Sequence, residues 1–229
     1  MQFTHETPIG EIVAFDFRTA SVFTEAGIDF CCGGKKSLIE SCEEKNIDVE
    51  TFTTGLQEVT STPISASQNF KEWNLDFLCD YIVNTHHKFV LKTLPELVFY
   101  TDKIASVHGE NHPELKEIAG LFTQINEELR QHLQHEEEDL FPAVKRMLAN
   151  PNESDRAIIR SEIDRMTGEH DFAGGAMDTI NQITNGYEVP ADGCSTYQVA
   201  FRLLHEFEDD LHVHVHLENN ILFPKAYNL

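Results

Sequence analysis

Two stretches of this chain carry a histidine and a glutamate at a spacing that suits metal binding. His132 and Glu136 precede a Leu-Phe-Pro tripeptide, and His214 and Glu218 precede a second copy of it. Residues four apart lie one turn above each other on an α-helix, so each pair presents an imidazole and a carboxylate on one face. Both groups are ligands for transition metals. The repeat therefore predicts a metal site assembled from two helices.

Two further histidines extend the repeat. His86 precedes the first pair and His170 precedes the second at nearly the same distance. The complete candidate set has four histidines and two glutamates: His86, His132, Glu136, His170, His214 and Glu218. A single zinc ion needs four ligands or fewer. Six such ligands suit two transition-metal ions with bridging carboxylates, and the absence of thiolates among them favours iron or manganese over copper or zinc.

Four long amphipathic helices would bring these residues together. Apolar residues recur at steps of three and four in four segments, and the six candidate ligands lie on the same faces. Turn-forming stretches at 109–113, 150–152 and 185–193 separate the segments. Long helices with short connections predict an all-α, up-down-up-down four-helix bundle, which we place at residues 74–229. Buried carboxylates in its core would need a compensating charge, which a metal supplies.

Other histidines in the bundle argue for the specificity of this set. His135 with Asp139 and His205 with Asp209 also lie four apart, but helical angles place these two histidines far from the apolar faces. We therefore expect four histidines to face solvent: His135, His205, His212 and His216. A single core histidine is more often structural than a metal ligand, so a helical domain without metal is the alternative. The duplicated set of six favours the metal site.

The first 60 residues form a separate block that is almost free of histidine. Short apolar runs predict small helices at residues 1–60, and a small, polar stretch predicts a linker at 61–73. Adjacent Cys31 and Cys32 precede two glycines and two lysines. Adjacent cysteines do not easily pair or chelate one metal. An exposed turn beside lysines would lower a thiol pKa and favour a redox or iron-transfer role, whereas burial as small apolar groups is the alternative.

The composition excludes several classes of partner. The chain has 229 residues, and Lys+Arg 17 against Asp+Glu 39 gives a net charge of −22. This acidic excess disfavours nucleic acid and anionic membranes, which are polyanions. No apolar run reaches 18 residues, and the first residues lack a basic segment, so we expect neither a membrane span nor a secretory signal. Five cysteines without framework spacing suit the reducing cytoplasm, and we expect Cys42, Cys79 and Cys194 to be structural.

These motifs resemble those of known families. The segments Asn84-Thr-His-His-Lys and Leu94-Pro-Glu-Leu, together with the two His-x-x-x-Glu blocks and Glu169-His-Asp, resemble the hemerythrin-like proteins. Residues 7–13 and 27–34 resemble the N-terminal module of the iron–sulfur cluster repair proteins, the RIC or ScdA-like di-iron family. The resemblance covers nearly the whole chain. It implies ligands at the six positions given above, where the apolar face places His86 inward rather than adjacent His87.

The resemblance implies a non-haem di-iron centre with bridging carboxylates and an oxo or hydroxo bridge. It further implies repair of iron–sulfur clusters damaged by oxidative or nitrosative stress, with damaged iron–sulfur proteins as partners and a homodimer as the assembly. Open coordination positions would admit O2 or nitric oxide. Glu137, Glu169 and Asp171 are candidates to orient the histidines, with a solvated surface as their alternative role.

Two mechanisms and one different function stay open. Imidazole and carboxylate are harder ligands than thiolate, so ferrous ions would be held less firmly and iron donation is plausible. Reaction with nitric oxide, as in a reductase, is the second mechanism. The different function is an O2 or nitric oxide carrier or sensor without repair activity, but an O2 carrier needs no cysteine module and a sensor usually has an attached signalling domain.

Overall fold

The computed structural model describes residues 3–65 and 67–229, and these residues fold almost entirely into helices. An isolated antiparallel bridge between Pro8 and Ser37 is the β-type contact within the described residues. The prediction of an all-α protein is therefore confirmed. Among the described helices, none combines the length and apolarity that crossing a bilayer requires.

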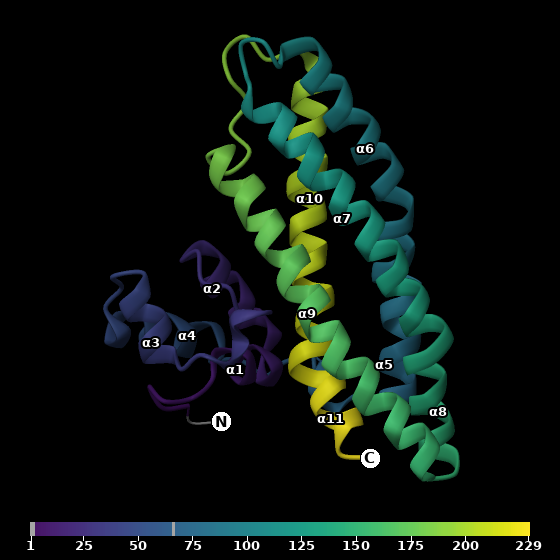
Figure 1. Ribbon diagram of the computed structural model, residues 1–229. Coiled ribbons are helices and arrows are strands. Elements are labelled where there is room, and N and C mark those ends of the chain that lie inside the picture. The colour runs from purple at the N-terminus through teal and green to yellow at the C-terminus, as the bar shows by residue number, and fades with distance from the viewer. Residues whose placement is uncertain (1–2, 66) are drawn as a thin grey trace.

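Four helical rods run along one another in the bundle (Figure 1). The first, second and fourth rods along the chain each consist of two α-helices joined by a π-helical turn. The remaining rod, third along the chain, is a single helix. Their bounds are α5 (Leu75–Ile82) and α6 (Lys88–His108), α7 (Glu114–His135) and α8 (Phe141–Ala149), α9 (Glu153–Ile183), and α10 (Ser195–Leu217) and α11 (Phe223–Tyr227). Short connections make successive rods antiparallel, as the sequence predicts.

The bundle core is divided into two apolar clusters. One cluster fills the part of the bundle nearer the loops at 109–113 and 185–193, with fully buried residues such as Leu94 and Phe122. The other lies nearer the C-terminus and includes Leu78 and Met166. In every rod the candidate metal ligands lie in sequence at or next to the point where members of one cluster give way to members of the other. A buried polar layer therefore crosses the bundle with apolar packing on both sides.

The N-terminal domain is a small group of short helices against one side of the bundle (Figure 1). Its α-helices are α1 (Ile9–Phe15), α2 (Ala20–Glu25), α3 (Leu38–Glu44) and α4 (Val49–Val59). Gly27, with φ +64°, ends α2 in the left-handed conformation that glycine adopts at low cost. Ser37 starts α3 through a capping box with Glu40. The predicted short helices of this block are present.

Asn220, on a π-helical turn of the last rod, attaches the N-terminal domain to the bundle. Its Nδ2 donates to the carbonyl oxygens of Phe30 and Cys31, each at 3.2 Å. Gly10 and Gly34 lie so close to the Asn220 amide that a Cβ at either position would collide with it. The loop that carries Cys31 and Cys32, which we call the cysteine loop, therefore lies directly against the rod that carries Glu218.

The expectation that His216 faces solvent is wrong. This side chain is 0% exposed and packs between the rings of Phe17 and Phe30 of the N-terminal domain. The amphipathic pattern of an isolated bundle leaves this face of α10 in solvent, whereas the N-terminal domain covers it. His205 is exposed as expected, and His212 is half-buried under the same domain.

Candidate metal centre

Six polar side chains from the four rods meet in the buried layer between the two apolar clusters. None is more than 1% exposed. Together we call them the cage: His87, His132, Glu136, His170, His214 and Glu218. Isolated charges at this depth would be strongly destabilising, so the group needs internal pairing or a bound cation.

Each glutamate lies between two imidazoles. Glu136 Oε2 is 3.2 Å from His87 Nε2 and 3.3 Å from His132 Nε2. Across the layer, Glu218 Oε1 is 2.9 Å from His214 Nε2, and its Oε2 is 3.1 Å from His170 Nε2. One carboxylate facing two imidazoles on either side is the arrangement in which a carboxylate can bridge two metal ions.

The ligand atoms divide into two overlapping groups. His87, Glu136, His214 and Glu218 offer atoms that all lie within 4.8 Å of one another. A second group, within the same limit, consists of His132, His170 and Glu218. Glu218 belongs to both groups, so the geometry accommodates two adjacent cations that share a carboxylate.

A π-helical turn explains why His87, and not His86, occupies the cage. The turn Val83–His87 places residues five apart on one face instead of four, so the face that includes Ile82 continues at His87. His86 instead donates from Nδ1 to Asp210 Oδ1 at 2.9 Å and stacks on the ring of His214. The structure brings the other five predicted ligands together and seats His87 in the place predicted for His86.

The same type of turn recurs at both glutamates. Glu136–Leu140 and Glu218–Leu222 are π-helical, and each begins at its cage residue. Single π turns within α-helices occur frequently at functional sites. In three of the four rods, such a turn changes the register at the polar layer while the apolar faces continue on both sides of it.

Three of the four histidines are held from outside the cage. Glu137 Oε1 lies 2.8 Å from His87 Nδ1, and Glu169 Oε2 lies 2.8 Å from His132 Nδ1. Asn219 Oδ1 lies 2.9 Å from His170 Nδ1. Each partner holds the Nδ1 side of its ring and leaves Nε2 facing the cage, as metal-ligating histidines require.

Glu137 and Glu169 therefore hold the histidines as expected from the sequence, whereas Asp171 is exposed and lines a cavity beside the cysteine pair. Sequence reasoning missed Asn219. The repeat contained the signal, because Asn219 directly follows Glu218 as Glu137 directly follows Glu136. The two residues perform the same task in the two halves of the bundle.

The electrostatics of the cage favour ionised glutamates and a positive charge on the two histidines beside Glu136, whereas burial lowers the pKa of His214. Burial disfavours charge on every group, yet Glu136 raises the pKa of His132 to about 10 despite it. Burial likewise opposes protonation of His87, whose pKa is nevertheless raised by Glu136. Against the same burial, His214 and His170 hold the pKa of Glu218 well below its usual value. The cage is thus built to surround positive charge.

Several cage atoms fit a metal better than they fit one another. His87 Nε2, both oxygens of Glu136 and Glu218 Oε2 are buried and make no hydrogen bond within the part of the chain that the structure describes. His87 Nε2, Glu136 Oε2 and Glu218 Oε2 lie at ion-pairing distance from their neighbours but without hydrogen-bond geometry. Buried polar atoms are rarely left unsatisfied, so convergent lone pairs of this kind indicate a cation site.

The cysteine pair lies directly against the cage. Cys32 Sγ is 3.5 Å from the backbone oxygen of His170. Asp29 organises the loop, because its Oδ1 accepts from the Cys31 thiol at 2.9 Å and from the backbone N–H groups of both cysteines. A cavity of about 330 Å³ opens beside the pair and is also lined by Asn219.

The thiols differ from the sequence expectation in one respect. The hydrogen bond to Cys32, burial and Asp29 raise the pKa of Cys31 well above its usual value. The lysine effect expected from the sequence is not seen at this thiol, and the Lys36 ammonium is bound by Glu44 at 2.6 Å. Cys31 is buried and Cys32 is half-buried. In this arrangement Cys31 is a protonated thiol.

Comparisons with known proteins match both parts of the chain. Residues 80–226 match the Hemerythrin HHE cation binding domain, and residues 5–60 match the ScdA_N domain, described as a domain of unknown function. The iron-sulfur cluster repair protein ScdA of Staphylococcus epidermidis is 30% identical over 224 residues, covering 97% of this chain and 99% of the relative. The iron-sulfur cluster repair protein YtfE of Yersinia pestis is 33% identical over 209 residues, covering 91% of each chain. YtfE of an Enterobacter species is 32% identical over 224 residues, covering 96% of each.

Proposed function

The chain belongs to the hemerythrin-domain family of iron–sulfur cluster repair proteins, and from this premise we propose that it restores damaged clusters with a di-iron centre. The observation that carries the proposal is the buried cage in which each of two glutamates faces two imidazoles. A cation-binding domain with this donor set suits iron, since hard oxygen and intermediate nitrogen donors are present without thiolate.

We assign one iron to His87 and His214 and the other to His132 and His170. Glu136 and Glu218 lie between the two pairs and would bridge the ions. Six protein ligands leave coordination positions for solvent, O2, nitric oxide or an oxo or hydroxo bridge. When bound, such a centre supplies exchangeable ferrous ions and one-electron chemistry.

The residues around the cage favour iron donation as its use. Glu137, Glu169 and Asn219 keep three Nε2 atoms aimed inward, so the cage persists while iron enters and leaves. Cys31 and Cys32 border a cavity that reaches Asn219, which makes them our candidates for passing iron or electrons between the cage and a partner. Damaged iron–sulfur proteins are the proposed partners, and a homodimer is the proposed assembly. The cytoplasm is the proposed compartment, since all five cysteines are free.

Iron analysis tests the centre, and a repair assay tests the function. After anaerobic reconstitution we expect about two irons per chain, and one or none contradicts the di-iron assignment. The ferrous protein should then restore activity to a dehydratase inactivated by nitric oxide. The variant with Cys31 and Cys32 changed to alanine should load iron normally but repair more slowly, and the Cys42→Ala variant is the matched control.

Two outcomes would redirect the proposal. Stable, reversible O2 binding without recovery of the dehydratase would show a carrier. Unchanged repair by the Cys31 and Cys32 variant would assign those thiols a structural role only.

A further inference from the structure

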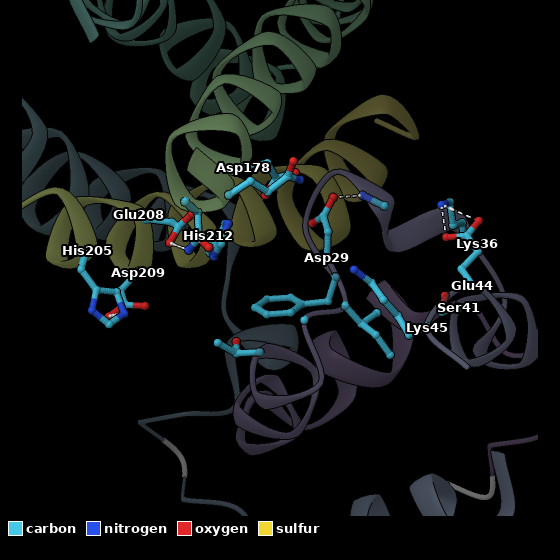
Figure 2. A pocket seen from close by; sticks show the side chains of 17 residues that line it. Asp29, Lys36, Ser41, Glu44, Lys45, Asp178, His205, Glu208, Asp209 and His212 are labelled. Atoms are coloured by element: carbon cyan, nitrogen blue, oxygen red, sulfur yellow. Dashed lines mark hydrogen bonds and ion pairs between the residues drawn. The ribbon is translucent and has the colours of Figure 1, made fainter. Parts of the chain in front are cut away.

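A second group of metal-ligating side chains lies in the cavity between the N-terminal domain and the bundle. The cavity has a volume of about 580 Å³ and is lined by both domains. Figure 2 shows Asp178 reaching into it from α9, Glu208 and His212 from α10, and Asp29 and Lys45 from the opposite wall. None of these residues belongs to the di-iron cage.

Asp178, Glu208 and His212 have the geometry of a three-residue cation site. One ligand atom from each lies within 4.8 Å of the others. Glu208 and His212 are four residues apart on α10, so they lie on one face of the helix as the cage pairs do. Two carboxylates and one imidazole suit first-row divalent ions such as Fe²⁺ and Mn²⁺, with water in the remaining positions.

The charge balance of the cavity is an independent indication of a cation. Glu208 is only 5% exposed, and its Oε2 accepts a hydrogen bond from the neutral amide of Asn181 at 2.8 Å. Beside it lies the buried Tyr187 hydroxyl, which does not reach hydrogen-bond geometry with any described residue. Neither the amide nor the hydroxyl carries a formal charge, so His212 is the neighbouring group of opposite charge that favours the ionised form of this buried carboxylate.

The lysines that line the cavity do not offset the burial of its carboxylates. Lys36 is bound by Glu44 at 2.6 Å. His212 and Lys45 favour the ionised form of Asp178, but burial and Asp29 outweigh them and raise the pKa of that carboxyl. Burial also raises the pKa of Glu208. Two carboxylates and one imidazole thus share the cavity, and a bound cation would favour the ionised form of both carboxylates.

We propose that Asp178, Glu208 and His212 form a third metal site, which binds one exchangeable divalent ion of the Fe²⁺ or Mn²⁺ type. The site borders the cysteine loop, because Asp29 lines the same cavity and accepts from the Cys31 thiol. Cys32 in turn touches the backbone of His170. The third site is thus the outer member of a row of contacts that leads to the cage, and it stands whether or not the protein repairs clusters.

Mn²⁺ titration of the iron-loaded protein, followed by the electron paramagnetic resonance of free Mn²⁺, tests the proposal. We expect the wild-type chain to bind one Mn²⁺ while its iron content stays constant. Asp178→Asn and His212→Gln should each weaken this binding at least tenfold. Glu206→Gln is the matched control, because it removes the same charge from an exposed position on α10 and should leave the affinity unchanged.

Equal Mn²⁺ binding by wild type and both variants, or no binding by any of them, would overturn the proposal. Circular dichroism and iron content of the same samples report the fold and the cage separately. Asp178 is exposed, so its variant tests the site without disturbing the core. The difference in bound Mn²⁺ between wild type and variant measures the occupancy of the third site even if the cage takes up no iron. Failure here is therefore distinct from failure of the repair proposal.

Discussion

At the scale of residues, His86 and His87 differ in role although they are adjacent and both buried. His87 faces Glu136 in the cage, and His86 faces Asp210 outside it. Replacing each histidine by alanine therefore compares a cage residue with its neighbour outside the cage. His87→Ala is expected to reduce iron from about two to about one per chain, because it removes a direct ligand. His86→Ala should retain both irons, and iron analysis of the two purified variants measures the difference. Equal losses would refute the assignment.

Cys194 offers a second test at this scale. From the sequence we expect Cys194 to be structural, but its thiol is exposed at the start of α10 and lies 3.2 Å from His108 Nε2. The hydrogen bond with His108 lowers its pKa to about 7. At pH 7 we expect Cys194 to react with iodoacetamide at least about tenfold faster than buried Cys42, by thiolate content and access. His108→Ala should slow the Cys194 reaction, and an unchanged rate in that variant would refute the pairing.

At the scale of elements, the π turns separate what the sequence predicts from what it does not. The four rods and five of the cage residues follow from a periodicity of 3.6, because that period holds within each α-helix. It fails across Val83–His87, where a π turn shifts the face by one residue. Nothing in the local composition distinguishes such a turn from an α turn. The sequence pattern therefore places the helix correctly but displaces its cage histidine by one position.

The buried face of α10 shows a second limit of periodicity. His216 and Glu208 lie off the bundle face, so an isolated amphipathic helix exposes both, yet the structure buries both. His216 is covered by aromatic rings of the N-terminal domain, and Glu208 lines the cavity between the two domains. A pattern within one helix carries no information about a domain that docks from elsewhere in the chain.

Replacement of glycine by alanine should have opposite effects in α1, where Gly10 lies against Asn220, and in α7, where Gly120 faces open space. Gly10→Ala places a Cβ against the Asn220 amide and should destabilise the protein by about 1–3 kcal/mol through overpacking. Gly120→Ala, with nothing within 4 Å of its added Cβ, should stabilise α7 by about 0.5–1 kcal/mol. Denaturant unfolding of both variants measures the effects. A stabilising Gly10→Ala would show that the domain docks without this close contact.

At the scale of the whole molecule, metal and protons compete for the cage, so stability should depend on pH differently with and without iron. Despite its burial, Glu136 raises the pKa of His132 to about 10 from an ordinary 6.5. The apo protein gains this stability in full below pH 6.5 and loses it as pH rises through 10. We expect its melting temperature to fall by roughly 5–10 °C over that range. The iron-loaded protein should show a smaller decline, because metal replaces the protons.

Thermal unfolding of apo and iron-loaded protein at several pH values between 6 and 10 measures this effect. His205→Gln is a suitable control, since His205 is an exposed histidine on α10 that does not belong to the cage. Parallel curves for the apo and loaded forms would contradict the exchange of protons for metal.

The consecutive residues Glu218, Asn219 and Asn220 connect three things at once. They contribute a cage carboxylate, hold the ring of His170 and anchor the cysteine loop. When two equilibria share a structural element, each must bias the other by the same factor. Seating of the N-terminal domain and retention of iron are therefore reciprocal. Under the proposed iron donation, a client that pulled the cysteine loop toward itself would weaken the hold on iron by as much as the iron favours the seated loop, which is the direction that delivery requires.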